Sequence, residues 1–208
     1  MCSSDLVGLV ADEKDILTQS FRAEGDVIVL LGDPGSAANQ GESGLGGSEY
    51  QAAKAGRLGG PPPRIDLEAE KKLQRLVLDL ARAHVLSSAH DVSDGGIAVA
   101  LAECCTTATN GALVGAHVTL PASSFVAGAL FGEAPSRVVV SMPKDRADDV
   151  MTRAKSAGVP ARQLGFTTGT GPKATLRIAV TSGPRLEVDV DKLRIARESC
   201  LDSIVGTG

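Results

Sequence analysis

The sequence predicts an α+β fold: a mixed β-sheet with packed helices. Short runs rich in Val, Ile and Leu, which are typical of strands, recur along the chain. The last two such runs, residues 175–180 and 185–190, alternate apolar and polar residues around a Gly-Pro turn, as a β-hairpin does. Between the strand segments lie amphipathic helix patterns, the clearest being the i, i+3, i+4, i+7 series of Leu73, Leu76, Val77 and Leu80.

Composition excludes several classes of protein. The chain has 208 residues, enough for one good core, and 43% of them are hydrophobic but only 2% aromatic, so Leu, Val, Ile and Ala must fill that core. A net charge of -4, with no run of Lys or Arg, argues against a nucleic-acid surface. No apolar stretch approaches the roughly 18–20 residues that span a bilayer, and no signal peptide is visible. We therefore expect no nucleic-acid partner and no membrane.

The four cysteines are Cys2, Cys104, Cys105 and Cys200, and none forms a C-x-x-C pair. A zinc site is therefore not expected. Cys104 and Cys105 are adjacent in a predicted helix, where they cannot readily bridge each other, so they are interpreted as small buried or half-buried residues. Because nothing requires an oxidising compartment, the expected location is cytoplasmic.

The first elements follow from local signals. The continuous apolar run at residues 27–32 predicts a buried strand. Residues 33–47 are rich in Gly, Ser and Asn and predict a loop. Ser48 and Gln51 have capping-box spacing, so a short helix should run to about residue 54. We favour an N-cap role for Ser48 over a role in shaping a ligand cleft.

A longer helix is expected over residues 67–84. Asp66 is a suitable N-cap, with acidic residues in the first turn, and His84 would complement the C-terminal end. The remaining expected elements are a strand at 85–89, a helix at 95–107, a strand at 116–120, a helix at 123–131, strands at 137–142 and 163–166 with a helix at 143–157 between them, the hairpin and a last helix at 191–204. His117 falls on the polar phase of its strand, so exposure is expected rather than ligation.

The stretch from His90 to Gly96 is the candidate site, since it combines a strand end, an acidic turn and two glycines that open a helix. Glycines let a backbone approach an anion, and a helix N-terminus offers unpaired N–H groups. Asp91 and Asp94 supply hard oxygen ligands of the kind that Mg²⁺ prefers beside phosphates. The alternative stays open, because Asp and Ser are ordinary N-caps and Gly-Gly is an ordinary tight turn.

Three ordered blocks of the chain closely resemble the last repeat of the phosphoribosylformylglycinamidine synthases, within the aminoimidazole ribonucleotide synthetase superfamily. The blocks are Gly44-Leu45-Gly46-Gly47-Ser48-Glu49-Tyr50, Ser88-Ala89-His90-Asp91-Val92-Ser93-Asp94-Gly95-Gly96, and Leu130-Phe131-Gly132-Glu133-Ala134-Pro135-Ser136-Arg137. Their order makes the match more specific than any single block. The resemblance implies the C-terminal domain fold of that superfamily over residues 25–208, with residues 1–24 an upstream remnant or linker.

The resemblance also implies a function. These synthetases are ATP-dependent C–N ligases of de novo purine synthesis that convert formylglycinamide ribonucleotide and glutamine-derived ammonia to the amidine. The implied cofactors are ATP or ADP and Mg²⁺, with Asp91 at a metal-binding position of the family's second nucleotide site and Ser93, Asp94, Gly95 and Gly96 at the nucleotide there. Two alternatives remain for that second site: a non-catalytic nucleotide site, or a relic that binds nothing. No catalytic residue is expected here, because the family's catalytic histidine lies in the first repeat.

The implied partners are the missing upstream half of the synthetase, a glutaminase subunit and a small accessory subunit, so the isolated chain is expected to be inactive. Two alternatives remain: another ATP-dependent enzyme of the superfamily, or a non-catalytic structural domain that docks those subunits. Glu133 and Arg137 mirror a substrate-binding segment of the first repeat, but Ala134 and Pro135 between them lack polar side chains. We therefore expect a structural role there, as an ion pair or with Arg137 capping nearby carbonyls.

Overall fold

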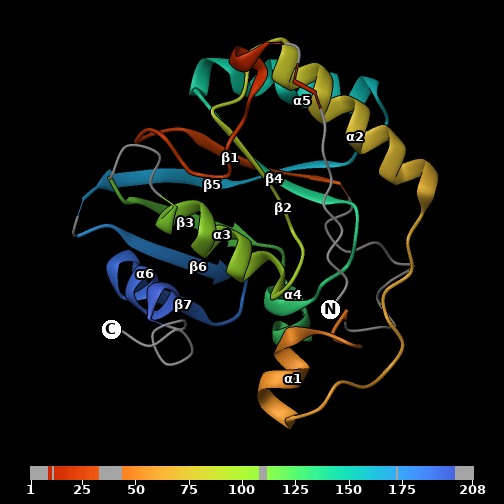
Figure 1. The fold of residues 1–208 in the computed structure, drawn as a ribbon, viewed down its shortest axis with the longest axis vertical. Helices are drawn as coiled ribbons and strands as arrows, with labels where there is room; N and C mark the ends of the chain where they lie inside the picture. Colours follow the sequence, from red (N-terminus) through yellow and green to blue (C-terminus); the bar gives the residue numbers. More distant parts are fainter. Residues whose placement is uncertain (1–8, 11, 33–43, 108–111, 172, 200–208) are drawn as a thin grey trace.

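The computed structural model describes residues 9–10, 12–32, 44–107, 112–171 and 173–199 (Figure 1). Most of the predicted loop at 33–47, Cys2, Cys200 and the end of the last predicted helix lie outside these residues. Residues 18–21 contact the folded domain, since Thr18 accepts a hydrogen bond from the Ala89 N–H (3.1 Å) and Phe21 is buried. The division between an upstream segment and a domain that starts at residue 25 stays a prediction.

The described strands form one mixed sheet of seven strands in the order β2-β4-β1-β5-β3-β6-β7. Their bounds are β1 Val27–Gly32, β2 Ser88–Asp91, β3 Val114–Leu120, β4 Arg137–Met142, β5 Ala161–Thr170, β6 Thr175–Val180 and β7 Arg185–Asp189. Neighbouring strands are antiparallel except for β3 and β6, which are parallel. The mixed sheet and the final hairpin of β6 and β7 are both confirmed.

Helices cover both faces of this sheet (Figure 1). The α-helices of the described residues are α1 Glu49–Ala55, α2 Leu67–Arg82, α3 Gly96–Thr106, α4 Val126–Phe131, α5 Ala147–Ser156 and α6 Val190–Glu198, with short 3₁₀ turns η1 Glu13–Asp15 and η2 Lys144–Arg146. The helices α2 and α5 pack on one face, while α3 and α6 pack on the other. The helix α1 stands off the sheet, beside α4.

Strand β1 explains why helices are needed on both faces. Val27, Val29 and Leu31 face the core under α2 and α5, whereas Ile28 and Leu30 face the core under α3. All six residues of the strand are buried. An unbroken apolar run is what a strand covered on both faces requires, so the predicted buried strand is confirmed at both of its ends.

One strand begins later than predicted. Residues 85–89 were expected to pair, but β2 starts at Ser88 because the preceding apolar residues close the end of α2. His84 adopts a left-handed conformation (φ 50°), its N–H donates to the Ala81 carbonyl, and the Val85 N–H donates to the Leu80 carbonyl. This is the Schellman pattern of a helix end, in which an apolar residue after the cap packs back on the helix. The strand consequently extends through Asp91.

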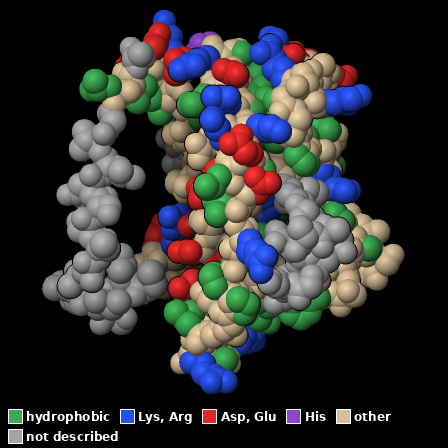
Figure 2. Space-filling view, turned by 90° about the vertical axis from the view of Figure 1, so that its right-hand side faces the viewer, with side chains coloured by type: hydrophobic (Ala, Val, Ile, Leu, Met, Phe, Trp, Pro, Cys, Tyr) green, Lys and Arg blue, Asp and Glu red, His purple; other side chains and the backbone are tan. Residues whose placement is uncertain are grey.

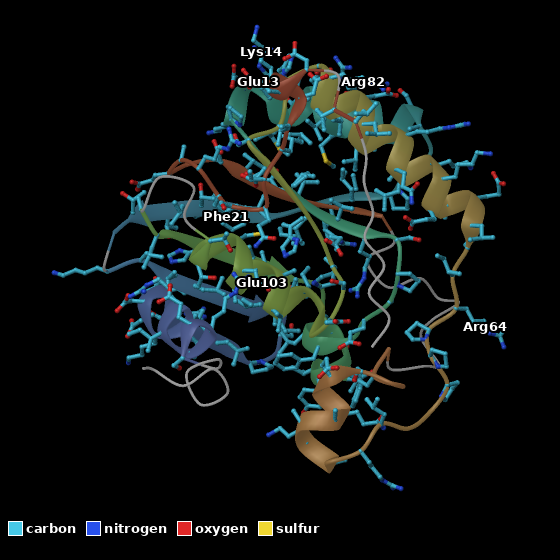
Figure 3. All side chains as sticks on the ribbon, in the orientation of Figure 1. Glu13, Lys14, Phe21, Arg64, Arg82 and Glu103 are labelled. Atoms are coloured by element: carbon cyan, nitrogen blue, oxygen red, sulfur yellow. The ribbon has the colours of Figure 1, made fainter. Side chains whose placement is uncertain are left out.

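His84 therefore does lie at the C-terminal end of α2, directly after the cap residue Ala83. Its Nε2 also lies 3.6 Å from the Asp15 Oδ1 of η1. Figure 3 shows the side chains of Glu13 and Lys14 next to Arg82 at this end of the helix.

Other boundaries differ by smaller amounts. Strand β5 is longer than predicted, since it pairs with both β1 and β3, with a register shift in each pairing. Its Gly165 and Gly169 interrupt the strand signal in the sequence. The helix expected at 143–157 is a 3₁₀ turn followed by α5. The helix α4 begins only at Val126, and α6 ends at Glu198.

A buried carboxylate lies where β1 begins. Asp26 is only 5% exposed, and its Oδ2 has no hydrogen-bond partner among the described residues. Its backbone is fixed, since its N–H donates to the Thr167 Oγ1 at 2.9 Å. Burial raises the pKa of Asp26, and hydrogen bonding with the Ser87 side chain lowers it by a smaller amount. The folded state therefore binds a proton at Asp26 more tightly than the unfolded chain does.

The variant Asp26→Asn is expected to be more stable than the wild type at neutral pH. An unsatisfied buried polar group costs about 1–3 kcal/mol, and more when it is charged. Asn keeps the polar side chain but removes the charge, so the free energy of unfolding should rise by about 1 kcal/mol. Because the folded-state pKa is raised, the wild type loses stability as the pH rises from the usual value of 3.8 through that pKa. The gain should therefore be close to zero below that pH and complete at neutral pH.

Urea unfolding at several pH values measures this gain. The control is Asp145→Asn, since the Asp145 side chain is 77% exposed and its neutralisation should leave the free energy of unfolding almost unchanged. A wild type as stable as Asp26→Asn at neutral pH would contradict the prediction.

Candidate functional site

The acidic turn joins β2 to α3 at one end of the sheet. Asp91 is the last residue of β2 and pairs with Val138 of β4, and the Val92 N–H then donates to the Arg137 carbonyl at 2.9 Å. Val92 is buried, whereas Ser93 and Asp94 are exposed. The Asp91 side chain is 71% exposed. The turn is thus anchored by its backbone and by one apolar side chain, and its polar side chains face solvent.

His90 links the turn to the helix behind it. Its side chain is only 11% exposed, with Nε2 2.8 Å from the Glu103 Oε2 and Nδ1 3.3 Å from the Asp91 Oδ1. Glu103 lies on α3 (Figure 3), and its other oxygen is 3.8 Å from Arg197 of α6. His90 therefore lies between two carboxylates, an arrangement that orients Asp91. No sequence pattern predicts this contact, because His90 and Glu103 are 13 residues apart.

The two glycines have structural reasons to be glycine. Gly95 and Gly96 have φ values of 76° and 67°, in the region that favours glycine. A Cβ on Gly96 would lie 2.7 Å from the Gly132 carbonyl oxygen and from the Phe131 carbonyl carbon. A Cβ on Gly95 would lie 2.4 Å from a Val99 methyl group. Gly96 thus lets the start of α3 pack directly on the end of α4, whereas Gly95 leaves room for Val99 of α3 itself.

The N–H groups of both glycines are already donated within the chain. Gly95 N–H donates to the Glu133 Oε1 at 2.7 Å, and Gly96 N–H donates to the Ser93 carbonyl at 3.0 Å. The same Glu133 oxygen accepts from the Glu49 N–H at 2.9 Å, at the first residue of α1. A carboxylate of the protein thus lies where an anion was expected. The nucleotide assignment of Ser93, Asp94, Gly95 and Gly96 and the metal assignment of Asp91 stay predictions.

Arg137 has the structural role that was expected of it. Its Nε donates to the Ala134 carbonyl at 2.9 Å, and its Nη2 donates to the Gly132 carbonyl at 2.6 Å. Of the two structural roles that were expected, an ion pair or the capping of carbonyls by Arg137, these bonds show the second. Glu133 itself binds two backbone N–H groups. Sequence reasoning missed this partner set because Glu133 is separated by 38 and 84 residues from its two donors.

The N-terminal cap of α1 lies beside the acidic turn and the end of α4, and we call this region the corner. Ser48 is buried, its Oγ accepts from the Gln51 N–H at 3.2 Å, and its hydroxyl donates to the Leu45 carbonyl. The expected N-cap role of Ser48 is confirmed. Tyr50 stacks on Phe131 with ring centroids 4.9 Å apart, so α1 is held against the end of α4.

Asp91 fits the way that magnesium binds to proteins. Among the described residues, no group of three or more His, Cys, Asp and Glu side chains is placed to hold a metal ion. Magnesium keeps several waters and uses one or two carboxylates together with substrate phosphates, not a cage made only of protein. An exposed carboxylate beside an exposed serine suits that mode of binding.

A hollow lies on the sheet, on the face turned away from α3 and α6. Its volume is about 490 Å³, and its lining includes His117, Phe166, Arg177 and Arg185. His117 is half-buried, not exposed as its strand pattern suggested, and its ring lies 6.0 Å from that of Phe166. Burial first, and then Arg177, lowers the pKa of His117, while Glu187 opposes the shift.

The two described cysteines are free and buried, as expected. Burial raises the pKa of Cys105 to about 12, and burial together with Cys105 and Glu103 raises the pKa of Cys104 well above its usual value. Thiols with raised pKa values are poor nucleophiles, so neither cysteine is a candidate catalytic group.

Two features are relevant to nucleic-acid and membrane partners: the distribution of charge on the surface, and the length and polarity of the helices. On the face drawn in Figure 2, Lys and Arg side chains are interspersed with Asp and Glu side chains. Among the described residues, each helix is too short or too polar to cross a membrane.

Comparison with known proteins identifies relatives of this chain. The family model described as "AIR synthase related protein, C-terminal domain" matches residues 23–177. The PurL subunit of phosphoribosylformylglycinamidine synthase from Anaeromyxobacter sp. (strain Fw109-5) is 44% identical over 170 residues, which cover 79% of this chain and 21% of the relative. The corresponding subunit from Thermobifida fusca is 39% identical over 202 residues, which cover 97% of this chain and 24% of the relative.

Solved structures agree on the fold. The structure of Thermotoga maritima PurL complexed with FGAR has a TM-score of 0.66 at 18% identity, covering 88% of this chain and 30% of that one. Other structures of that protein contain AMPPCP, ATP or ADP, and one is the assembly PurLQS. The resemblance found in the sequence is confirmed, and the chain spans about a fifth to a quarter of the length of these curated relatives.

The close packing at the start of α3 can be tested with a pair of glycine variants. Gly96 and Gly158 share a φ of 67°, but a Cβ on Gly158 would meet nothing within 4 Å. Gly158→Ala should therefore cost about 1–2 kcal/mol, the backbone strain alone. Gly96→Ala should cost about 1–3 kcal/mol more, because the added methyl overpacks the contact with Phe131 and Gly132. Thermal and urea unfolding give both values, and equal losses would contradict the packing argument.

Proposed function

This chain belongs to the family of AIR synthase related proteins, through their C-terminal domain, and from that premise we propose that it forms the C-terminal part of a phosphoribosylformylglycinamidine synthase. The proposed reaction is the ATP-dependent conversion of formylglycinamide ribonucleotide and ammonia to the amidine. The observation that carries this proposal is the acidic turn, with exposed Asp91 and Ser93, in a chain 44% identical to a PurL subunit.

The proposed role of the chain is to supply one wall of a nucleotide site. Asp91, oriented by His90, would hold Mg²⁺, and the exposed Ser93 and Asp94 would contact the nucleotide. The metal would neutralise phosphate charge, which is the main demand of phosphoryl transfer. Gly95 and Gly96 shape the turn through their backbone conformation, and their N–H groups stay with Glu133 and Ser93.

Partners and location follow from the same proposal. A chain of about a fifth of the relatives' length would work only with the rest of the synthetase. The solved PurLQS assembly of Thermotoga maritima supports further subunits, for which we propose a glutaminase and a small accessory subunit. The proposed compartment is the cytoplasm.

A second candidate function is a structural domain that binds no nucleotide. The observation that favours it is that the backbone donors at the start of α3 are already used within the chain. Under this alternative the acidic turn is only a connection, and Asp91 serves as a partner of His90.

Substitution of Asp91 tests the nucleotide site directly. Calorimetric titration with Mg·ADP is made on this chain alone and on a chimera in which it replaces the matching segment of the Anaeromyxobacter relative. Asp91→Asn removes the charge with little change of shape and should weaken Mg·ADP binding about tenfold or more, since charge-assisted contacts to a metal–nucleotide complex are the strong ones.

The matched control is Asp145→Asn. Its carboxylate is as exposed as that of Asp91 but follows the far end of β4, at the opposite end of the sheet, so its binding constant should equal that of the wild type. If the chimera binds Mg·ADP and the isolated chain does not, the site is one that the upstream part of the synthetase completes. Unchanged affinity in Asp91→Asn would reject Asp91 as the metal ligand, and no binding by either wild-type protein would favour the structural alternative.

A further inference from the structure

Resting on the proposed function, we propose that Glu133 is a positioning residue, whose carboxylate fixes the acidic turn against α1 and so sets how Asp91 and Ser93 meet the nucleotide. The assignment gives a specific task to a segment for which only a structural role was expected, and it involves no direct contact with substrate. It follows from which backbone groups Glu133 binds.

One oxygen of Glu133 joins two segments that are distant in the sequence. Its Oε1 accepts from the Gly95 N–H at 2.7 Å and from the Glu49 N–H at 2.9 Å. A carboxylate that accepts from backbone N–H groups at helix starts makes strong, charge-assisted hydrogen bonds. The N-terminal ends of α3 and α1 are therefore both hydrogen-bonded to the same atom, the Glu133 Oε1.

The backbone of Glu133 is itself fixed from both sides. Its N–H donates to the Gly44 carbonyl at 2.9 Å, just before the cap of α1. Arg137 clamps the same segment through its hydrogen bonds to Ala134 and Gly132. The carboxylate cannot shift without disturbing these contacts, so it is a rigid support and not a mobile surface group.

Gly95, to which Glu133 is hydrogen-bonded, is close in the chain to the two residues that Glu133 is proposed to position, Asp91 and Ser93. Gly95 follows Asp94 directly, and the Gly96 N–H is bonded to the Ser93 carbonyl. The other end of the turn is tied to β4 through Val92 and to His90 through Asp91. Without Glu133, the turn would keep its hydrogen bond to β4 and the packing of Gly96 on Phe131 and Gly132, but it would lose its connection to α1. The orientation of Ser93 would then be less restricted.

Three variants test this assignment. Glu133→Ala removes the acceptor, whereas Glu133→Gln keeps an oxygen at Oε1 without the charge. The control Asp66→Ala removes a similar arrangement, since the Asp66 Oδ1 accepts from the Glu68 and Ala69 N–H groups at 2.9 and 3.1 Å at the start of α2, on the other face of the sheet. Both alanine variants lose two carboxylate hydrogen bonds to backbone donors.

The first measurement is amide hydrogen exchange of the whole chain, with unfolding temperatures alongside. In Glu133→Ala, the amide exchange rates of Gly95 and Glu49 should rise at least tenfold more than the exchange rates of β1 do. In Glu133→Gln, most of the protection at these two amides should remain. Asp66→Ala should lower the unfolding temperature to a similar extent but leave the exchange of Gly95 unchanged. Wild-type exchange at Gly95 in Glu133→Ala would overturn the assignment.

The second measurement is Mg·ADP affinity by calorimetry in the same chimera, at a temperature where every variant is folded. Glu133→Ala should bind about tenfold more weakly, Glu133→Gln within about threefold of the wild type, and Asp66→Ala like the wild type. Faster exchange at Gly95 with unchanged affinity would overturn the positioning role and leave a purely structural clamp. A wild type that binds no Mg·ADP would overturn the proposed function and, with it, the positioning of a nucleotide, whereas exchange at Gly95 would still decide whether Glu133 holds the turn.

Discussion

The burial of β1 on both faces is the constraint on which the rest of the structure depends. A strand with Ile28 and Leu30 on one side and Val29 and Leu31 on the other needs an apolar cover above and below. The covers are α2 with α5 and α3 with α6. Since α3 must then start at the sheet end where β2 finishes, the connection between them is forced to be a short turn, and that turn carries Asp91, Ser93 and Asp94.

Close backbone approach governs the corner itself. The start of α3 lies so near the end of α4 that a single Cβ on Gly96 would clash with Phe131 and Gly132. At that distance the buried N–H groups require partners from within the chain, because an unpaired backbone donor is costly. Glu133 supplies one of them at Gly95. The Gly-Gly pair thus serves packing first, and the polar side chains of the turn remain the part that faces outward.

Local signals were sufficient for much of the fold. The periodicity of α2, the apolar run of β1 and the cap at Ser48 depend on near neighbours in sequence, and the structure agrees with each. The start of β2 was wrong because Val85 satisfies two rules at once: it has a strand-forming side chain, but it closes the end of α2. The partners of Glu133 could not be found, since a hydrogen bond across 84 residues leaves no pattern in the sequence.

The contacts around Gly95 and Asp91 distinguish between two ways in which a nucleotide could bind beside the acidic turn. A phosphate held mainly by the helix N-terminus would compete with Glu133 for the Gly95 N–H, and the carboxylate would repel it. A nucleotide bound through a cation at Asp91 meets neither problem, because the metal brings positive charge to an exposed acid. The same geometry that speaks against the glycine loop as a phosphate cradle therefore favours recognition by the side chains of the turn. In the proposed arrangement, Glu133 would support the turn through the Gly95 N–H, and the exposed carboxylate of Asp91 would bind the cation.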